Sequence, residues 1–122
     1  MVLFDSNIII SASKPDNVIL RDFIVLTQHS ISIVSKIEVL GYSNISYAEH
    51  TFLDEYFAKV SIIELTHEIV EVAIALRKIR RLTLGDSVIA ATARFMGIPL
   101  VTNSEKDFSW IEGLTIINPL KQ

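Results

Sequence analysis

The segment that most constrains the fold lies at residues 84–93 and reads Leu-Gly-Asp-Ser-Val-Ile-Ala-Ala-Thr-Ala. Its small apolar residues predict a helix that packs closely against a neighbouring layer. Gly-Ile-Pro at positions 97–99 ends this helix, and the apolar residues at 100–102 predict a buried strand. Asp86 therefore stands at the start of a packed helix, and any function assigned to it depends on which other side chains reach the same place.

The rest of the chain alternates between short apolar segments and helical patterns. Strands are expected at residues 1–4, 31–34, 61–65, 100–102 and 114–117, and helices at 8–12, 17–29, 35–42, 46–59 and 66–81, in the segment containing Asp86, and around 107–111. Several of the strands are apolar without interruption, as in parallel sheets that are covered on both faces. The pattern predicts a three-layer α/β/α fold with a central parallel sheet, in a single domain at residues 1–122.

Composition excludes several classes of protein. Half of the residues are apolar and a fifth are charged, which argues against disorder. The absence of cysteine excludes a disulfide scaffold and a thiolate metal site. No apolar run approaches the roughly 18 residues of a membrane span, and no basic region precedes the first strand, so we expect a cytoplasmic protein without a membrane partner. The high apolar content favours a surface reserved for a partner or a second copy.

Four acidic residues follow strands or begin helices at one expected edge of the sheet. They are Asp5, Glu38, Asp86 and Asp107. In an open parallel sheet, ligands bind beyond the carboxyl ends of the strands. The net charge of −3 argues against a broadly basic nucleic-acid surface, but four carboxylates at one site would account for all of it. The acidity of the chain would then be local.

Each of these acids also has an ordinary explanation. Ser35 and Glu38 have the spacing of a capping box, as do Thr83 and Asp86. Negative charge is favourable at a helix start because the helix dipole is positive there. Ser46 and Glu49 have the same spacing, although nothing suggests a function for them, so the capping-box pattern alone has little specificity.

Converging carboxylates repel one another, and a divalent cation relieves that repulsion. An all-oxygen set of ligands favours Mg²⁺, with Mn²⁺ as the alternative. A zinc site is not expected, because His29, His50 and His67 have no spacing typical of zinc ligands. The chemistry that such a site supports is phosphodiester hydrolysis.

Neutral polar residues near the acids are candidate helpers that would position water or phosphate. They are Ser6, Asn7, Thr102 and Ser104. A basic group precedes Asp86 and could hold an RNA backbone; it comprises Arg77, Lys78, Arg80 and Arg81. These cations are equally well explained as favourable charge at the end of a helix.

Four segments resemble the motifs of the PIN domain family. Apolar residues followed by Asp-Ser-Asn at positions 5–7 resemble its opening motif, and residues 35–41 its second acidic motif. Residues 84–93 are similar to its Leu-x-Asp-x-x-Ile-Ala-Ala-Thr-Ala segment, and residues 102–108 with 116–119 to its closing region. These motifs span nearly the whole chain. The one departure is Ser104, which stands where the closing motif often has Asn or Asp.

The length and motif set are most similar to the VapC-type toxins of toxin–antitoxin pairs. This resemblance implies a Rossmann-like PIN fold and a Mg²⁺-dependent endoribonuclease that acts on RNA. It also implies inhibition by a cognate antitoxin protein and a homodimer. By motif, the acidic metal-site and catalytic positions are Asp5, Glu38, Asp86 and Asp107.

Two alternatives remain open at the level of sequence. A phospho-accepting receiver domain would need an acceptor aspartate after the third strand, but residues 61–66 end without one. A catalytically silent PIN-like module that binds RNA or protein is the second alternative, because an intact set of acids does not prove turnover.

Overall fold

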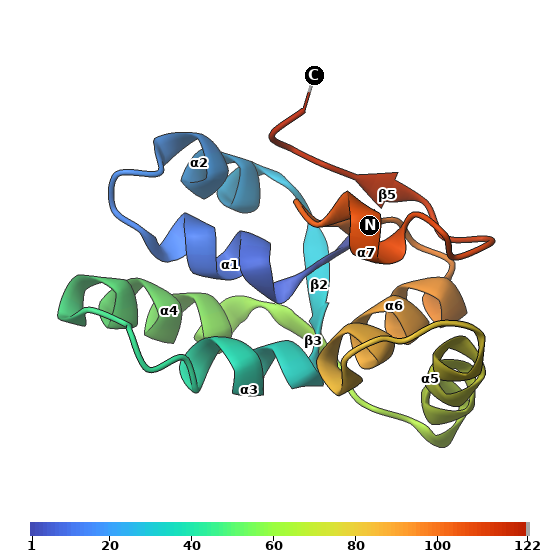
Figure 1. The fold of residues 1–122 in the computed structure, drawn as a ribbon. Helices are drawn as coiled ribbons and strands as arrows, with labels where there is room; N and C mark the ends of the chain where they lie inside the picture. The colour runs from blue at the N-terminus through green and yellow to red at the C-terminus, as the bar shows by residue number, and fades with distance from the viewer. Residues whose placement is uncertain (122) are drawn as a thin grey trace.

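The computed structural model describes residues 1–121, which form a parallel sheet flanked by helices on both sides (Figure 1). The strands are β1 (Val2–Phe4), β2 (His29–Ser32), β3 (Ser61–Ile63), β4 (Leu100–Val101) and β5 (Ile116–Ile117). The helices are α1 (Ser6–Ser13), α2 (Val18–Leu26), α3 (Ile33–Leu40), α4 (Tyr47–Lys59), α5 (His67–Ile79), α6 (Leu84–Met96) and α7 (Glu105–Phe108). The strand order is β3-β2-β1-β4-β5, and all neighbours are parallel. The predicted three-layer fold is confirmed.

The two faces of the sheet are covered by different halves of the chain. Consecutive strand residues point to opposite faces, so Leu3 and Leu100 lie in one apolar cluster with α5, α6 and α7. Phe4 and Val101 lie in the other, with α1, α2, α3 and α4. All four side chains are fully buried. A strand that is buried on both faces explains why β1 and β4 read as uninterrupted apolar sequence.

Two predicted boundaries around β2 are wrong. Helix α2 ends at Leu26 rather than at residue 29, because His29 pairs with Val2 in the sheet and its ring stacks on Phe4 with centroids 4.0 Å apart. Helix α3 begins two residues earlier than expected. Its N-cap is Ser32, whose hydroxyl accepts a hydrogen bond from the backbone of Val34. Helical periodicity shows a segment's inner face, but the end of α2 is set by strand pairing and the start of α3 by the cap at Ser32.

The last third of the chain follows the prediction more closely. Helix α6 ends at Gly97, which adopts the left-handed conformation (φ 68°) and donates to carbonyls of the last turn. Glycine adopts this conformation without steric strain, which explains the sharp stop before β4. The short helix α7 lies at Glu105–Phe108, earlier than the predicted 107–111, and β5 contains only the last two of four expected residues. No helix within residues 1–121 is long and apolar enough to cross a bilayer.

Candidate active site

Asp5 lies where β1 and β4 end side by side. Its backbone amide donates to the carbonyl of Val101 (2.9 Å), and its side chain accepts a hydrogen bond from Thr102 Oγ1 at Oδ2 (2.7 Å). The residue is only 4% exposed. The strand pairing and the threonine together fix the Asp5 carboxylate at the carboxyl edge of the sheet.

Glu38 reaches the same edge from the second turn of α3. The Ser6 hydroxyl donates to Glu38 Oε1 (2.7 Å) and lies 2.9 Å from the Ser35 hydroxyl, which can donate to it in turn. The carboxylate of Glu38 also rests against Gly85 at the start of α6, where a Cβ atom would overlap Oε2. The first turns of α1 and α6 accordingly meet the second turn of α3 near the middle of Figure 1.

Asp86 is the third residue of α6, and its backbone amide is capped by Thr83 Oγ1 (3.1 Å). Burial raises its pKa, and the carboxylates of Asp107 and Glu38 raise it further. The pKa of Asp5 rises from 3.8 to about 6, chiefly through burial and in smaller part through the carboxylates of Asp86 and Glu38, while the hydrogen bond from Thr102 opposes the rise. Each of the four predicted acids therefore lies close enough to another to affect its ionisation.

The candidate helpers form a small network between α1 and the loop after β4. Asn7 Nδ2 donates to Ser104 Oγ (2.9 Å) and approaches Thr102 Oγ1 (3.5 Å), and the backbone amide of Ser104 donates to the same threonine oxygen (3.0 Å). Asn7 Oδ1 is buried and has no hydrogen-bond partner among the described residues. Ser104, the one departure from the motif, is thus tied directly to Asn7.

Among residues 1–121, no group of three or more acidic or histidine side chains is gathered closely enough to hold a metal ion as it stands. The donor chemistry nevertheless fits a hard divalent cation, because every candidate ligand is an oxygen. Burial is the main cause of the raised Asp5 pKa, but the carboxylates of Asp86 and Glu38 add to it, and a bound cation would relieve that repulsion.

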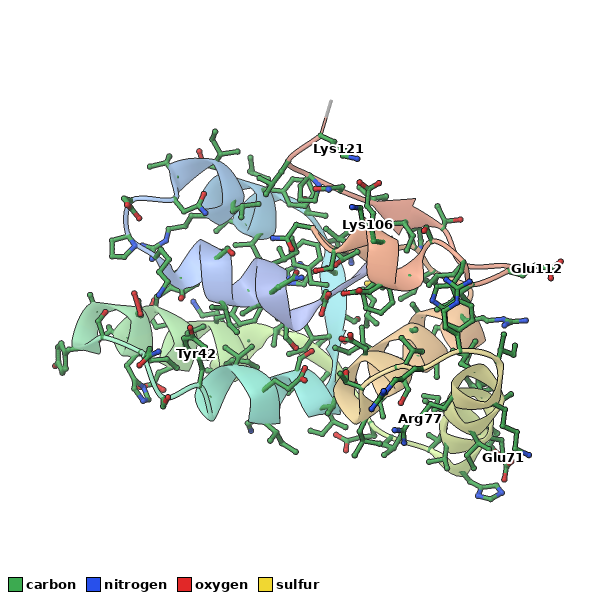
Figure 2. The ribbon with its side chains drawn as sticks, in the orientation of Figure 1. Tyr42, Glu71, Arg77, Lys106, Glu112 and Lys121 are labelled. Atoms are coloured by element: carbon green, nitrogen blue, oxygen red, sulfur yellow. The ribbon has the colours of Figure 1, made fainter. Side chains whose placement is uncertain are left out.

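A cleft of about 510 Å³ opens beside Asp86 and Asp107. Its walls are cationic: Arg77, Arg80, Arg81 and Lys106. Figure 2 shows Arg77 on α5 and Lys106 on α7, on either side of α6 in this view. Within the described residues, none of these four cations forms an ion pair with a carboxylate. They are therefore available to a polyanionic ligand.

Trp110 lines the same cleft, and nothing in the sequence analysis pointed to it. The Arg80 guanidinium lies over its ring, 5.1 Å from the centroid. Its spacing of three residues from Asp107 was the one available signal, because residues three apart on a helical turn face the same side. Lys106 was missed as well. Of the predicted basic group, Lys78 does not line this cleft.

One ordinary explanation of the acids is wrong. Ser35 lies inside α3 rather than at its start, so Ser35 and Glu38 do not form a capping box. Thr83 does cap α6 by accepting from the backbone amide of Asp86. The reciprocal capping box belongs to Ser46, the N-cap of α4, and Glu49 in its first turn. Glu38 thus has no capping role to account for its position.

An open parallel α/β sheet with acidic side chains at its carboxyl edge defines a class of proteins that bind ligands at that edge. The particular family is shown by its model: the PIN domain model matches residues 2–114, and the chain belongs to this family. The resemblance predicted from the four motifs is confirmed. No curated protein sequence matches the chain.

Several solved structures share the fold. A chain of a toxin–antitoxin complex from Klebsiella pneumoniae is 28% identical, with full coverage of both chains and a TM-score of 0.81. A chain of VapBC2 from Rickettsia felis, bound to a promoter DNA fragment, is 24% identical over 97% of this chain and 98% of its own (TM-score 0.79). A chain of DNA-bound VapBC from Salmonella typhimurium is 20% identical over 98% and 99% (TM-score 0.82). The predicted similarity to VapC-type toxins agrees with these structures.

Proposed function

We propose that this protein is a metal-dependent endoribonuclease that hydrolyses RNA phosphodiester bonds. The observation that supports this proposal best is the gathering of acidic side chains at the sheet edge: Asp5 is buried there and fixed by Thr102, and Glu38 reaches the start of α6, which carries Asp86. Keeping several acids together in a folded protein is unfavourable unless a ligand compensates. A cationic cleft opens directly beside them, as a site for a polyanion requires.

In this proposal the metal is Mg²⁺, with Mn²⁺ as the alternative, and its ligands come from Asp5, Glu38, Asp86 and Asp107. When bound, such an ion supplies a water of lowered pKa and offsets negative charge on the phosphate. The chain's own polar residues hold the ligands in place: Thr102 orients the Asp5 carboxylate, and Ser6 orients that of Glu38. Asn7 is fixed by Ser104, and its buried carbonyl oxygen has no hydrogen-bond partner among the described residues.

The cationic side chains of the cleft would hold the RNA next to Asp86, which lines the same cleft. Arg77, Arg81 and Lys106 lie on three separate segments of the chain, so together they can contact successive phosphates. Phosphate contacts position a nucleic acid without reading its sequence. These residues therefore bind the substrate but do not by themselves select it.

We also propose that the chain is the toxin of a toxin–antitoxin pair, a single-domain protein at residues 1–122 that forms a homodimer and is held inactive in the cytoplasm by an antitoxin protein. Support comes from the chain's likeness, at 28% identity, to a chain of the Klebsiella pneumoniae toxin–antitoxin complex. Large apolar side chains on α2 and α3 are strongly exposed, including Ile19 (74%), Leu26 (83%) and Ile37 (71%). Exposed apolar surface of this kind is typical of regions covered by protein partners.

The test of nuclease activity compares two aspartate variants on single-stranded RNA with Mg²⁺ or Mn²⁺. Asp86→Asn removes a site carboxylate and is expected to lower the cleavage rate by about 100-fold or more. The control Asp54→Asn changes an exposed aspartate that pairs with His50 on α4, and it should cleave like the wild type. Cleavage must also stop in EDTA. Equal cleavage by Asp86→Asn and wild type would contradict the proposed site.

The silent binding module makes a different prediction in the same assay. A protein of that kind would bind RNA in Mg²⁺ and EDTA alike and would cleave none of a varied set of RNAs, including tRNA. Binding without cleavage across such a set would replace the nuclease proposal with this second function.

A further inference from the structure

We propose that Trp110 and Arg80 form a stacking subsite for one unpaired base of the RNA, beside the acidic cluster. This inference rests on the proposed function, because it says that the proposed nuclease site binds its RNA through an unpaired base. Trp110 would be a residue that binds and positions substrate, and the base that it holds would belong to a nucleotide close to the bond that is cut.

The indole of Trp110 is a fixed platform. Its Nε1 donates a hydrogen bond to the backbone carbonyl of Asp107 (2.8 Å). Part of the ring packs against the core cluster that contains Phe108 and Ile111, and part lines the cleft. A side chain held in this way loses little conformational freedom when a ligand stacks on it.

The Arg80 side chain, which lines the cleft, covers one face of the indole. The guanidinium lies 5.1 Å from the ring centroid and has no ion pair within the described residues. An RNA base is also flat, and stacking on an aromatic side chain contributes to single-strand binding with every base type. A base can take the place of the guanidinium on the ring, and Arg80 is then free to pair with the adjoining phosphate.

The placement of the platform links it to the acids. The Trp110 indole donates a hydrogen bond to the backbone carbonyl of Asp107, and both residues line the cleft together with Asp86. A base on the indole therefore brings its own phosphate toward the carboxylates. In a double helix both faces of each base are covered by neighbouring bases, so the subsite requires an unpaired nucleotide.

The chain has one tryptophan, so its intrinsic fluorescence reports on this subsite alone. The experiment titrates the full-length protein with a single-stranded oligoribonucleotide in EDTA, where no metal-dependent cleavage occurs. We expect saturable quenching of the tryptophan by oligouridine. An oligomer of abasic ribose phosphates and an RNA duplex of equal length should quench far less, because neither offers a free base. Equal quenching by these two probes, or none by oligouridine, would overturn the proposal.

Two substitutions at position 110 separate stacking from a purely structural role. Trp110→Phe keeps an aromatic face and should bind labelled oligouridine within about threefold of the wild type, while Trp110→Leu keeps apolar volume and should bind about tenfold more weakly. The charge control is Arg81→Gln. It should reduce the slope of log affinity against log salt by about 0.7, a slope that Trp110→Leu leaves unchanged. Wild-type affinity in Trp110→Leu would overturn the proposal.

These measurements fail independently of the nuclease proposal. Quenching and affinity in EDTA test the subsite, whereas cleavage in Mg²⁺ tests the chemistry. Base-dependent quenching in a protein that never cleaves would support the subsite and contradict the nuclease. Cleavage by a protein whose tryptophan does not respond to oligouridine would support the nuclease and contradict the subsite.

Discussion

Asp5 is a buried carboxyl that the fold holds in an unfavourable environment. It is fixed by Thr102 and by the backbone of Val101. Burial, with a smaller contribution from the carboxylates of Asp86 and Glu38, raises its pKa to about 6. Because the folded protein binds this proton more tightly than the unfolded chain, ionising Asp5 works against folding. The contribution of Asp5 to the free energy of unfolding is therefore largest below pH 4, and it is lost as the pH rises through about 6.

Asp5→Asn should remove that dependence. The amide stays neutral and can still accept the hydrogen bond from Thr102, so we expect the variant to be more stable than the wild type at pH 7 by about 3 kcal/mol, for a shift of about two pKa units. Urea unfolding of both proteins at pH 4 and pH 7, without divalent metal, measures the difference. Asp54→Asn on the exposed face of α4 is the control and should match the wild type. A less stable Asp5→Asn protein at pH 7 would contradict this account.

At the scale of single residues, the sequence predicted the four acids from their places at strand ends and helix starts, with the family motifs in agreement, and the polar helpers from their nearness to those acids. It did not indicate that the Glu38 carboxylate is held by Ser6 from another helix, since this contact joins residues 32 positions apart. Nor did it point to Trp110, whose importance depends on Arg80 folding back over its ring. Contacts between distant segments follow from the tertiary fold, which residue spacing does not encode.

Among the elements, the contact between α3 and α6 shapes the acidic site. Glu38 fits against Gly85 only because glycine has no side chain at this position. Glycine is otherwise unfavourable inside a helix by roughly 0.5–1 kcal/mol relative to alanine. The first turn of α6 thus gives up helix stability where the Glu38 carboxylate needs space.

Gly85→Ala should separate stability from activity. The added methyl group overlaps Glu38 Oε2, the far end of a flexible side chain, so Glu38 can move away while the helix gains from alanine. We expect a melting temperature equal to or above that of the wild type and RNA cleavage at least tenfold slower. The control Leu84→Ala alters an exposed neighbour in the same turn and should retain cleavage. Full activity in Gly85→Ala would show that the Glu38 position is not needed.

The existence and order of the elements were predictable, whereas several of their ends were not. Helix α6 was predicted well because Thr83 and Gly97 mark its two ends by local capping. The end of α2 and the start of α3 were misplaced because β2 forms through pairing with β1 and β3, which the local sequence does not reveal. Local capping marked both ends of α6, whereas the pairing of His29 in the sheet ended α2 early and the cap at Ser32 was not recognised.

For the molecule as a whole, the site joins the two halves of the chain. Asp5 and Glu38 come from the half that covers one face of the sheet, and Asp86 and Asp107 from the half that covers the other. A ligand that binds all four carboxylates therefore stabilises the folded arrangement of both halves, because it has no comparable site in the unfolded chain.

Millimolar Mg²⁺ should accordingly raise the melting temperature by several degrees, and the rise should be smaller in Asp5→Asn. Thermal unfolding at pH 7 with and without Mg²⁺ measures this, with NaCl at matched ionic strength as the control for screening. Equal melting temperatures of the wild type with Mg²⁺ and with NaCl would count against a shared metal site.

The central position of β1 has a consequence for synthesis on the ribosome. During synthesis β1 can pair on one side with β2, whereas its other side stays uncovered until β4 has been made. Thr102, which orients Asp5, arrives just after that strand. A nascent chain therefore lacks the finished acidic edge until β4 and Thr102 have been made, so the proposed site cannot act on RNA before that point.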